Sequence, residues 1–576
     1  MSSNMYSAIK QIQIIVSLLK QYDIRNVVIS PGTRHVPLVH CLEIDPFFTT
    51  YSIVDERSAA YFALGLSESL NEPVAVTCTS ATATCNYLPA IQEAFERGIQ
   101  LLALTSDRAR YQRFNGENQC INQVDMYKPF VRYSVDLPNV KNDEEYWYCN
   151  RCVNEALIEL NHHGKGPVQI NFLQPLTLEE LSSFTVKEIS ETRKIKLHQT
   201  DVNWDDVKVY LSQKKRILVA SGQNTVNEEL NRTLNEFSNN RNVVVTKDHF
   251  SNLSGEHFIH APYLSVILNS EEIISFKPDL IISYGTKVFS EIIVRYRNCG
   301  IEHWHIDPEG RINDITRTLS AVYEMKPSEF FSKANPSLIG DNAYLKMWRD
   351  RLEDIDFSEN VFTNNSVIRD VLQKLPENSV VHASVLNSMR LSNFYSLPKN
   401  TSYVGNIGCD GIDGALSTFL GQASCHKKIS LLIVGDLSFL YDLNGAINKI
   451  PNNVRILLIN NYAGAEFHYN ISLNKISTLN QNIAAGHHTS IKEIIKLTNL
   501  EYWSADNNGT LEKLSLAFFE KSDFPILLEV FTDANTDGEC LRNFFSKNIK
   551  LTKRNRVGNI IRLVLGNKIA EVLRKL

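Results

Sequence analysis

The hydrophobic positions of this chain fall into short apolar runs separated by longer segments with helical spacing. In the first third of the chain the runs occupy residues 27–29, 74–78, 101–105 and 168–172, and a helical pattern covers residues 8–22. Apolar runs of this length bounded by turn residues predict buried strands. Their alternation with helical segments predicts α/β layers around parallel sheets.

The same alternation returns twice further along the chain. The second region has candidate strands at residues 216–220, 243–246, 280–284 and 304–307, and the third region has them at 380–382, 402–404, 431–434, 455–459 and 526–530. No G-x-G-x-x-G motif follows a candidate strand of the second region, so a dinucleotide site is not predicted there.

Two polar connections, residues 187–205 and 335–365, separate the three regions. A chain of 576 residues is also too long for a single hydrophobic core. The predicted fold class is therefore α/β, with three doubly wound parallel-sheet domains. We place these domains at residues 1–186, 200–335 and 360–545, and a basic amphipathic tail at 546–576.

Charge is distributed unevenly between this tail and the rest of the chain. Nine of the 59 Lys and Arg residues follow residue 546, against one of the 64 acidic residues, so the remainder has a net charge of −13 and the whole chain −5. The tail is expected to cover an apolar groove of its own protein, to dock on a partner or to lie on an anionic membrane surface. Nucleic acid is not an expected partner, because the sequence has no known nucleic-acid module.

The sequence favours a cytoplasmic location. The first nine residues lack the basic segment and apolar run of a signal peptide, and no apolar stretch has the length of a membrane-spanning helix. Cys149 and Cys152 form a C-x-x-C, but no second such pair or histidine cluster completes a zinc site. Reduced thiols are the better interpretation of the ten cysteines.

Two strand ends in the third region carry oxygen-bearing residues that suit a metal ion. One candidate strand leads into Gly435, Asp436 and Ser438, and the next leads into Asn461 and Ala463. In a parallel sheet both ends lie at the carboxyl edge, where ligands bind. A carboxylate, an amide oxygen and a carbonyl are hard ligands for Mg²⁺ or Ca²⁺, and such a metal can hold a diphosphate. Gly-Asp at 435–436 or Asn-Asn at 460–461 alone is typical of a turn, so the prediction of a metal site depends on their occurring together.

A carboxylate at the start of a predicted helix complements this pattern. Glu56 follows the apolar pair Ile53 and Val54 and precedes a helical pattern over residues 59–69. Thiamine diphosphate needs a carboxylate that hydrogen-bonds its aminopyrimidine ring and so promotes loss of the proton on the reactive carbon. Glu56 is the candidate for that role, although an acid in a first helical turn is commonly only a dipole partner.

Motifs in both halves of the chain resemble one family of thiamine-diphosphate enzymes. They read SPGTR at 30–34, DERSA at 55–59, TSATA at 79–83, LTSDR at 104–108, NQ at 118–119, GIDG at 411–414, GDLS at 435–438 and YDLN at 441–444. Over most of residues 1–545 the chain is similar in these motifs to the 2-succinyl-5-enolpyruvyl-6-hydroxy-3-cyclohexene-1-carboxylate synthases.

The resemblance implies that the three domains are, in order, a pyrimidine-binding domain, a central domain and a diphosphate-binding domain. It implies thiamine diphosphate with Mg²⁺, or with Mn²⁺ or Ca²⁺, as cofactors. The cofactor would lie between the pyrimidine-binding domain of one subunit and the diphosphate-binding domain of another. The protein would then be a homo-oligomer, a dimer or a tetramer, with its active site at the subunit interface.

The resemblance also implies roles for individual residues. The catalytic positions are Glu56 and Gln119, and the metal ligands are Asp436, Asn461 and the carbonyl of Ala463. The residues expected to contact the cofactor are Glu56, Thr82, Gly435, Ser438 and Phe467. The residues expected to bind substrate are Thr33, Arg34, Arg108, Asn118 and Arg390. For Arg34 and Arg108, a structural ion pair is the alternative.

The sequence departs from the family pattern where carboxylates would bind. Ile407 stands in place of an arginine, and Ser290 with Glu291 stands in place of a Lys-Arg pair. The serine segment before Arg390 is altered. Glu466 is either a polar substitution in the wall beside the cofactor, or the alignment of this loop with the family pattern is shifted by one residue. A carboxylate bound without a cation leaves a desolvated charge. We therefore expect a smaller donor such as pyruvate, or an acceptor such as a nucleotide-linked keto sugar.

The predicted function is thiamine-diphosphate- and metal-dependent decarboxylation of a 2-oxo acid, with transfer of the acyl carbanion to an acceptor and with altered substrates. One alternative is the unaltered synthase of menaquinone biosynthesis, which joins 2-oxoglutarate and isochorismate. Others are a catalytically silent scaffold and a flavin-containing relative of the acetolactate-synthase type. Retention of Glu56, Asp436 and Asn461 argues against a silent protein.

Overall fold

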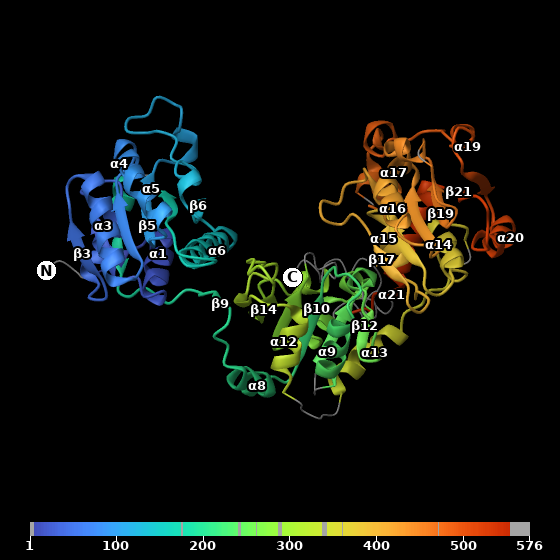
Figure 1. The fold of residues 1–576 in the computed structure, drawn as a ribbon, viewed down its shortest axis with the longest axis horizontal. Helices are drawn as coiled ribbons and strands as arrows, with labels where there is room; N and C mark the ends of the chain where they lie inside the picture. Colours follow the sequence, from blue (N-terminus) through green and yellow to red (C-terminus); the bar gives the residue numbers. More distant parts are fainter. Residues whose placement is uncertain are drawn as a thin grey trace, which may run out of the picture. The chain divides into compact units, whose positions relative to one another are not determined.

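The computed structural model describes residues 5–173, 177–239, 243–260, 262–285, 291–336, 342–359, 361–447, 449–470 and 472–552 (Figure 1). These residues form two compact units. The first is drawn from Met1–Leu197 and Ile312–Val322, and the second from His198–Arg311 and Tyr323–Leu576. Two of the three unit boundaries fall within short strands, β9 (Lys196–His198) and β15 (Leu319–Tyr323), and the third falls between Arg311 and Ile312.

A six-stranded parallel sheet forms the centre of the first unit. Its strand order is β3 (Thr49–Ser52), β2 (Asn26–Ile29), β4 (Val74–Cys78), β5 (Leu101–Asp107), β7 (Val168–Leu173) and β6 (Tyr133–Asp136). A separate pair, β1 (Tyr6–Ser7) and β8 (Phe184–Val186), is antiparallel. Every residue of β4 and β5 is buried, as expected for central strands covered on both faces.

Helices cover both faces of this sheet. The helices are α1 (Lys10–Gln21), α2 (Val36–Ile44) and α6 (Asp143–Glu159) on one face, and α3 (Glu56–Leu70) and α5 (Leu88–Arg97) on the other. Val27 of β2 packs in the first of the two apolar clusters and its neighbour Val28 in the second, as the alternation of strand side chains requires. Cys149 and Cys152 are free thiols of α6 buried in the first cluster.

The second unit contains a further set of parallel strands. Their order is β12 (Phe258–His260), β11 (Val243–Lys247), β10 (Ile217–Ser221), β13 (Leu280–Tyr284) and β14 (Glu302–Ile306). The accompanying helices are α8 (Trp204–Gln213), α9 (Glu228–Ser238), α10 (Leu264–Ile267), α11 (Ser270–Ser275), α12 (Pro327–Ala334) and α13 (Ala343–Glu353). Ser290 and the side chain of Glu291, two of the altered family positions, lie outside the described part of the chain.

The last sheet of the second unit is also parallel and has six strands. Its order is β17 (Ser402–Val404), β16 (Val380–Ala383), β18 (Ser430–Gly435), β19 (Val454–Asn460), β21 (Ile526–Phe531) and β20 (Glu501–Ala505). The surrounding helices are α14 (Asn364–Leu372), α15 (Asn387–Ser392), α16 (Ala415–Ala423), α17 (Asp436–Tyr441), α18 (Ala465–Tyr469), α19 (Lys492–Ile495), α20 (Asn508–Phe518) and α21 (Ala534–Asn548). From β16 the chain first adds β17 on one side and then β18 on the other. The direction of winding therefore reverses between β16 and β18.

Two histidines join the sheets of the second unit. The Nε2 of His249 donates to the carbonyl of Tyr395 at 2.9 Å, and the Nε2 of His260 donates to the carbonyl of Asn393 at 2.6 Å. A carbonyl only accepts, so Nε2 carries the proton in both rings. The ring centroids are 4.5 Å apart. Burial lowers the pKa of His260 to about 4 and lowers that of His249 well below its ordinary value.

The predicted α/β class, with several parallel sheets flanked by helices, is confirmed. The exact domain boundaries stay a prediction. The tail proposed for residues 546–576 lies mostly outside the described residues, which end at 552. Within the described ranges, no helix is both long enough and apolar enough to cross a membrane.

Candidate active site and metal centre

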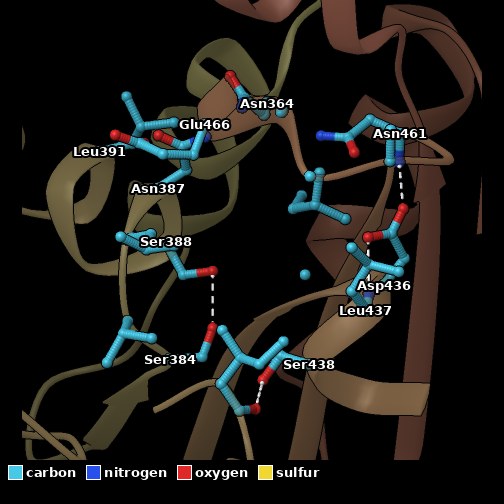
Figure 2. A pocket seen from close by; sticks show the side chains of 18 of the residues that line it. Asn364, Ser384, Asn387, Ser388, Leu391, Asp436, Leu437, Ser438, Asn461 and Glu466 are labelled. Atoms are coloured by element: carbon cyan, nitrogen blue, oxygen red, sulfur yellow. Dashed lines mark hydrogen bonds between the residues drawn. The ribbon is translucent and has the colours of Figure 1, made fainter. Parts of the chain in front are cut away.

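A cavity of about 210 Å³ lies at the carboxyl edge of the last sheet (Figure 2). Segments that follow β16, β18 and β19 form much of its wall, at residues 384–388, 435–438 and 461–467. The reversal of winding between β16 and β18 separates the loops that leave these strands. Open α/β sheets bind their ligands in the crevice that results.

Asp436 is the first residue of α17 and is almost fully buried at the cavity. Its Oδ1 accepts a hydrogen bond from the backbone N–H of Leu437 at 2.7 Å, and its Oδ2 accepts one from that of Asn461 at 3.1 Å. His487 Nε2 lies 3.4 Å from the same Oδ2. Burial is the largest influence on this carboxyl group and raises its pKa. A divalent cation beside Asp436 would favour the ionised form instead.

The two polar atoms of the Asn461 amide have different surroundings. Its Nδ2 donates to Asp537 Oδ2 at 3.1 Å, whereas its Oδ1 is buried and has no hydrogen-bond partner among the described residues. Tyr462 then adopts a left-handed conformation with φ of 62°, and its carbonyl accepts from the N–H of His487 at 2.8 Å. This turn leads the chain to Ala463, which lines the cavity.

These oxygen atoms fit a divalent metal. A buried carboxylate, a buried amide oxygen without a donor and a nearby backbone carbonyl are hard ligands of the kind that Mg²⁺ prefers. Asp436 and Asn461 would hold the metal from two neighbouring strand ends, with the carbonyl of Ala463 as the third protein ligand. A metal would also satisfy the orphaned Oδ1 of Asn461, whose burial is otherwise costly.

Three further residues of the predicted cofactor set line the same cavity. Gly435 ends β18, and a Cβ added there would meet no atom within 4 Å, so the space beside it is open to a ligand. The hydroxyl of Ser438 donates to the carbonyl of Ile412 at 2.6 Å. Ser438 therefore offers a diphosphate close approach but no free hydroxyl hydrogen. Phe467 of α18 contributes an aromatic wall.

Glu466 lines the cavity, in agreement with a polar substitution in its wall. Both of its carboxylate oxygens accept hydrogen bonds from the guanidinium of Arg390 on α15, one of them from Nη2 at 3.0 Å. Arg390 Nη1 also donates to Asn387 Oδ1 at 2.8 Å. The cation predicted to bind substrate is thus already paired within the protein. Figure 2 shows Glu466 and Asn387 across the cavity from Asp436.

Glu56 lies in the first unit, at the first position of α3. The side chain of Asp55 caps this helix by accepting from the N–H of Ser58 at 2.8 Å, which leaves Glu56 free of the capping role. Asn86 Nδ2 lies within 3.5 Å of Glu56 Oε2, and the Glu56 side chain is partly exposed. The carboxylate can therefore accept a hydrogen bond from a ligand.

The structure brings three predicted substrate residues together in the first unit. Arg34 Nη1 donates to Gln119 Oε1, and Arg108 Nη2 donates to the carbonyl of Asn118 at 2.7 Å. Burial lowers the pKa of Arg34, and the nearby positive charge of Arg108 lowers it further. Two close guanidinium groups suit an anionic ligand. An ion-pair partner is present as well, since Glu117 lies 3.5 Å from Arg108 Nη1.

Gln119 joins this cluster to Ser80 through two hydrogen bonds. Its side-chain nitrogen Nε2 donates to the backbone carbonyl of Ser80 at 3.2 Å, and Ser80 Oγ donates to the backbone carbonyl of Gln119 at 2.9 Å. Thr33 is exposed and lies between β2 and α2, and Thr82 is exposed at the first position of the short helix α4 (Thr82–Asn86).

Several residues support these sites through contacts that the sequence did not predict. Gln123 is fully buried, and its Oε1 accepts from the N–H of Ala81 at 2.7 Å, which holds the left-handed residue before Thr82. Asp537 holds the amide of Asn461, and Glu466 holds Arg390. The sequence did not predict these contacts, because each partner lies far in sequence from the residue it holds.

A parallel α/β fold with oxygen atoms suited to a divalent metal, beside a cavity at the winding reversal, agrees with the class of thiamine-diphosphate-dependent enzymes. Residues 9–126 match the family described as thiamine pyrophosphate enzyme, N-terminal TPP binding domain. Proteins from Bacteroides thetaiotaomicron and Phocaeicola vulgatus are 34% and 33% identical to the chain, and one from Flavobacterium johnsoniae is 30% identical. Each alignment covers 94% of this chain and 99% of the relative, and all three relatives are named 2-succinyl-5-enolpyruvyl-6-hydroxy-3-cyclohexene-1-carboxylate synthase.

The chain belongs to the family of thiamine-diphosphate-dependent enzymes that includes these synthases. Its cofactors are accordingly thiamine diphosphate and a divalent metal ion.

Proposed function

We propose that this enzyme decarboxylates a 2-oxo acid that has no second carboxylate, such as pyruvate, and transfers the acyl carbanion to an acceptor. The pairing of Arg390 with Glu466 carries the proposal. A second carboxylate could bind Arg390 only by displacing Glu466, which would leave a partly buried carboxylate without its hydrogen bonds. Losing hydrogen bonds to a charged group costs about 1–3 kcal/mol.

The charge of the cavity wall supports the same substrate class. Among the lining residues that the structure describes, Asp436 and Glu466 are the acids, and none is Lys, Arg or His. Ile407, which by its resemblance to the family takes the place of an arginine, is fully buried and brings no charge to the site. A donor with one carboxylate needs fewer cations than a dicarboxylic donor.

The protein's own residues have distinct tasks in this proposal. Thiamine diphosphate, when bound, supplies the nucleophilic carbon and takes up the electrons of the broken carbon–carboxylate bond. Glu56 accepts a hydrogen bond from the aminopyrimidine ring, which favours loss of the proton from that carbon. Arg34 and Arg108 bind the carboxylate of the donor, and Gln119 orients it through its bond to Arg34.

The names of the relatives favour a second candidate, which is the synthase reaction itself. For this family the resemblance implies 2-oxoglutarate as donor and isochorismate as acceptor. The 34% identity across 94% of the chain and the retained pair of Arg34 and Arg108 support it. The two candidates differ in whether the donor carries a second carboxylate.

Carbon dioxide release distinguishes the candidates. Purified full-length protein with thiamine diphosphate and Mg²⁺ is supplied with pyruvate or with 2-oxoglutarate, each with and without isochorismate. We expect kcat/KM for pyruvate to exceed that for 2-oxoglutarate by about tenfold or more, the factor that about 1.4 kcal/mol provides. Preference for 2-oxoglutarate, with formation of the isochorismate adduct, would select the synthase reaction instead.

A further inference from the structure

Asp537 contacts the metal centre from a helix that lies outside all of the recognised motifs. It is the fourth residue of α21 and is 1% exposed. Its Oδ2 accepts hydrogen bonds from Asn461 Nδ2 at 3.1 Å and Thr532 Oγ1 at 2.8 Å, and its Oδ1 accepts from the N–H of Asn364 at 2.9 Å. Because the donors belong to three separate segments, the carboxylate has little freedom to move.

The packing of α21 brings this carboxylate to the site. A Cβ added at Gly538 would lie 2.7 Å from the backbone carbonyl carbon of His468, so α21 touches the backbone of α18 at the residue after Asp537. Arg542, one turn further along α21, donates hydrogen bonds to the carbonyls of His468 and Tyr469. Close helix packing therefore fixes the distance between Asp537 and the loop that carries Asn461.

An asparagine amide has two orientations that exchange its oxygen and its nitrogen. In the observed orientation the N–H of Asn461 meets the Asp537 carboxylate, and Oδ1 is buried at the cavity without a donor. The opposite orientation would set Oδ1 against a carboxylate that has no hydrogen to offer. It would also turn an N–H group toward the metal position, where only an acceptor can bind a cation.

We propose that Asp537 is a positioning residue that holds the amide of Asn461 with Oδ1 presented to the metal. It acts through the hydrogen bond to Nδ2 and does not itself bind the metal. The inference rests on the proposed role of Asn461 as a metal ligand and is independent of the identity of the substrates. Partners of this kind commonly change metal affinity about 10–100-fold when they are replaced.

The test measures Mn²⁺ binding to the full-length apo-protein at saturating thiamine diphosphate, by calorimetry or electron paramagnetic resonance. Asp537→Asn should weaken Mn²⁺ binding by about tenfold or more. Thr532→Val is the matched control, since it removes the other bond to Oδ2 and leaves the bond to Asn461. Its Mn²⁺ affinity should stay within about twofold of the wild-type value.

A double variant that exchanges the side chains of positions 461 and 537 distinguishes an effect on the orientation of the Asn461 amide from an effect on the stability of α21. Asn461→Asp combined with Asp537→Asn places a carboxylate at the ligand position, which needs no orientation, and an amide donor behind it. This variant should bind Mn²⁺ at least about fivefold more tightly than Asp537→Asn alone. A residue that only stabilised α21 would give no such recovery. Where Asp537→Asn does not fold, the same recovery is expected relative to Asn461→Asp alone, because the exchange removes the repulsion between two carboxylates.

Two results would overturn the proposal. One is an Asp537→Asn protein whose Mn²⁺ affinity lies within about twofold of the wild type. The other is an exchanged double variant that binds no better than the single variants. Unchanged affinity in Asn461→Ala would instead remove Asn461 from the ligand set, which distinguishes failure of the metal assignment from failure of the positioning role.

Discussion

The guanidinium of Arg390 and the carboxylate of Glu466 form a two-bond ion pair at the cavity of the last sheet. The pair joins α15 to α18, and both side chains are partly exposed, at 29% and 26%. A paired arginine presents little net charge to a substrate. The acid at position 466 therefore decides whether Arg390 is available to bind one.

Glu466→Gln should release Arg390 and extend the donor range. We expect KM for 2-oxoglutarate to fall by about tenfold, since a charge-assisted hydrogen bond contributes about 1.5–3 kcal/mol, and KM for pyruvate to change by less than about twofold. Steady-state carbon dioxide release measures both constants. The double variant with Arg390→Met is the control and should lose the gain. Equal changes for the two donors would mean that the pair does not act on the second carboxylate.

Glu56→Gln should lower kcat by about 10²–10⁴-fold, because the neutral amide cannot favour loss of the proton in the same way. Binding of thiamine diphosphate should remain. Glu68→Gln is the matched control on the same helix, since Glu68 forms a half-exposed ion pair with Arg97. Activity within a few-fold of wild type in Glu56→Gln would show that the activating carboxylate lies elsewhere.

Gln123 is expected to be important for the stability of the first unit. Its side chain accepts from the N–H of Ala81 and donates to the carbonyl of Ser106 and to Asn171 Oδ1, both at 3.0 Å. Gln123→Leu leaves these buried groups unsatisfied and should lower the free energy of unfolding by about 2–4 kcal/mol. Urea unfolding measures the change. Gln13→Leu on α1, which removes a bond to the carbonyl of Ser7 and an exposed bond from Lys10, should have a much smaller effect. Equal midpoints would contradict the assigned network.

His260 should make stability depend on pH. Its pKa in the folded protein, about 4, lies below the ordinary value of 6.5, so the unfolded chain binds more protons between these limits. Stability from this group is present above pH 6.5 and is lost as the pH falls toward 4, by about 3 kcal/mol in total. Burial raises the pKa of the nearby Asp248 to about 7, and this carboxyl responds in the opposite direction.

The comparison with a variant isolates the contribution of His260. Gln at position 260 keeps a donor for the carbonyl of Asn393 but does not titrate. We expect His260→Gln to lose less stability than the wild type between pH 7 and pH 5, as measured by chemical unfolding. Parallel pH profiles for the two proteins would mean that His260 titrates normally in the folded state.

The sequence predicted most of the central strands but few of those at the sheet edges. Residues 74–78 and 280–284 match β4 and β13, whose residues are all buried and mostly apolar. The strands β3, β6, β12 and β20 were missed, and each lies at the edge of its sheet. An edge strand packs against fewer neighbours, so polar residues such as Thr49 and Glu501 are tolerated and the apolar signal is weak.

The candidate site was predictable only where its residues follow strands. Asp436 and Asn461 lie directly after β18 and β19, and adjacent parallel strands bring such positions together. Asp537 reaches the same site from a helix 76 residues after Asn461, and Glu466 reaches Arg390 across the same separation of 76 residues. Contacts of this kind depend on how helices pack, which a local pattern does not specify.

The proposed metal centre is tested most directly by calorimetric titration of the full-length apo-protein with thiamine diphosphate, in the presence and absence of Mg²⁺. We expect binding that depends on Mg²⁺ and is lost in Asp436→Ala, since this variant removes the buried carboxylate ligand while Glu56 and the first unit stay unchanged. Cofactor binding that is equally tight without Mg²⁺, or that survives in Asp436→Ala, would contradict the assignment of the cavity as the metal and diphosphate site.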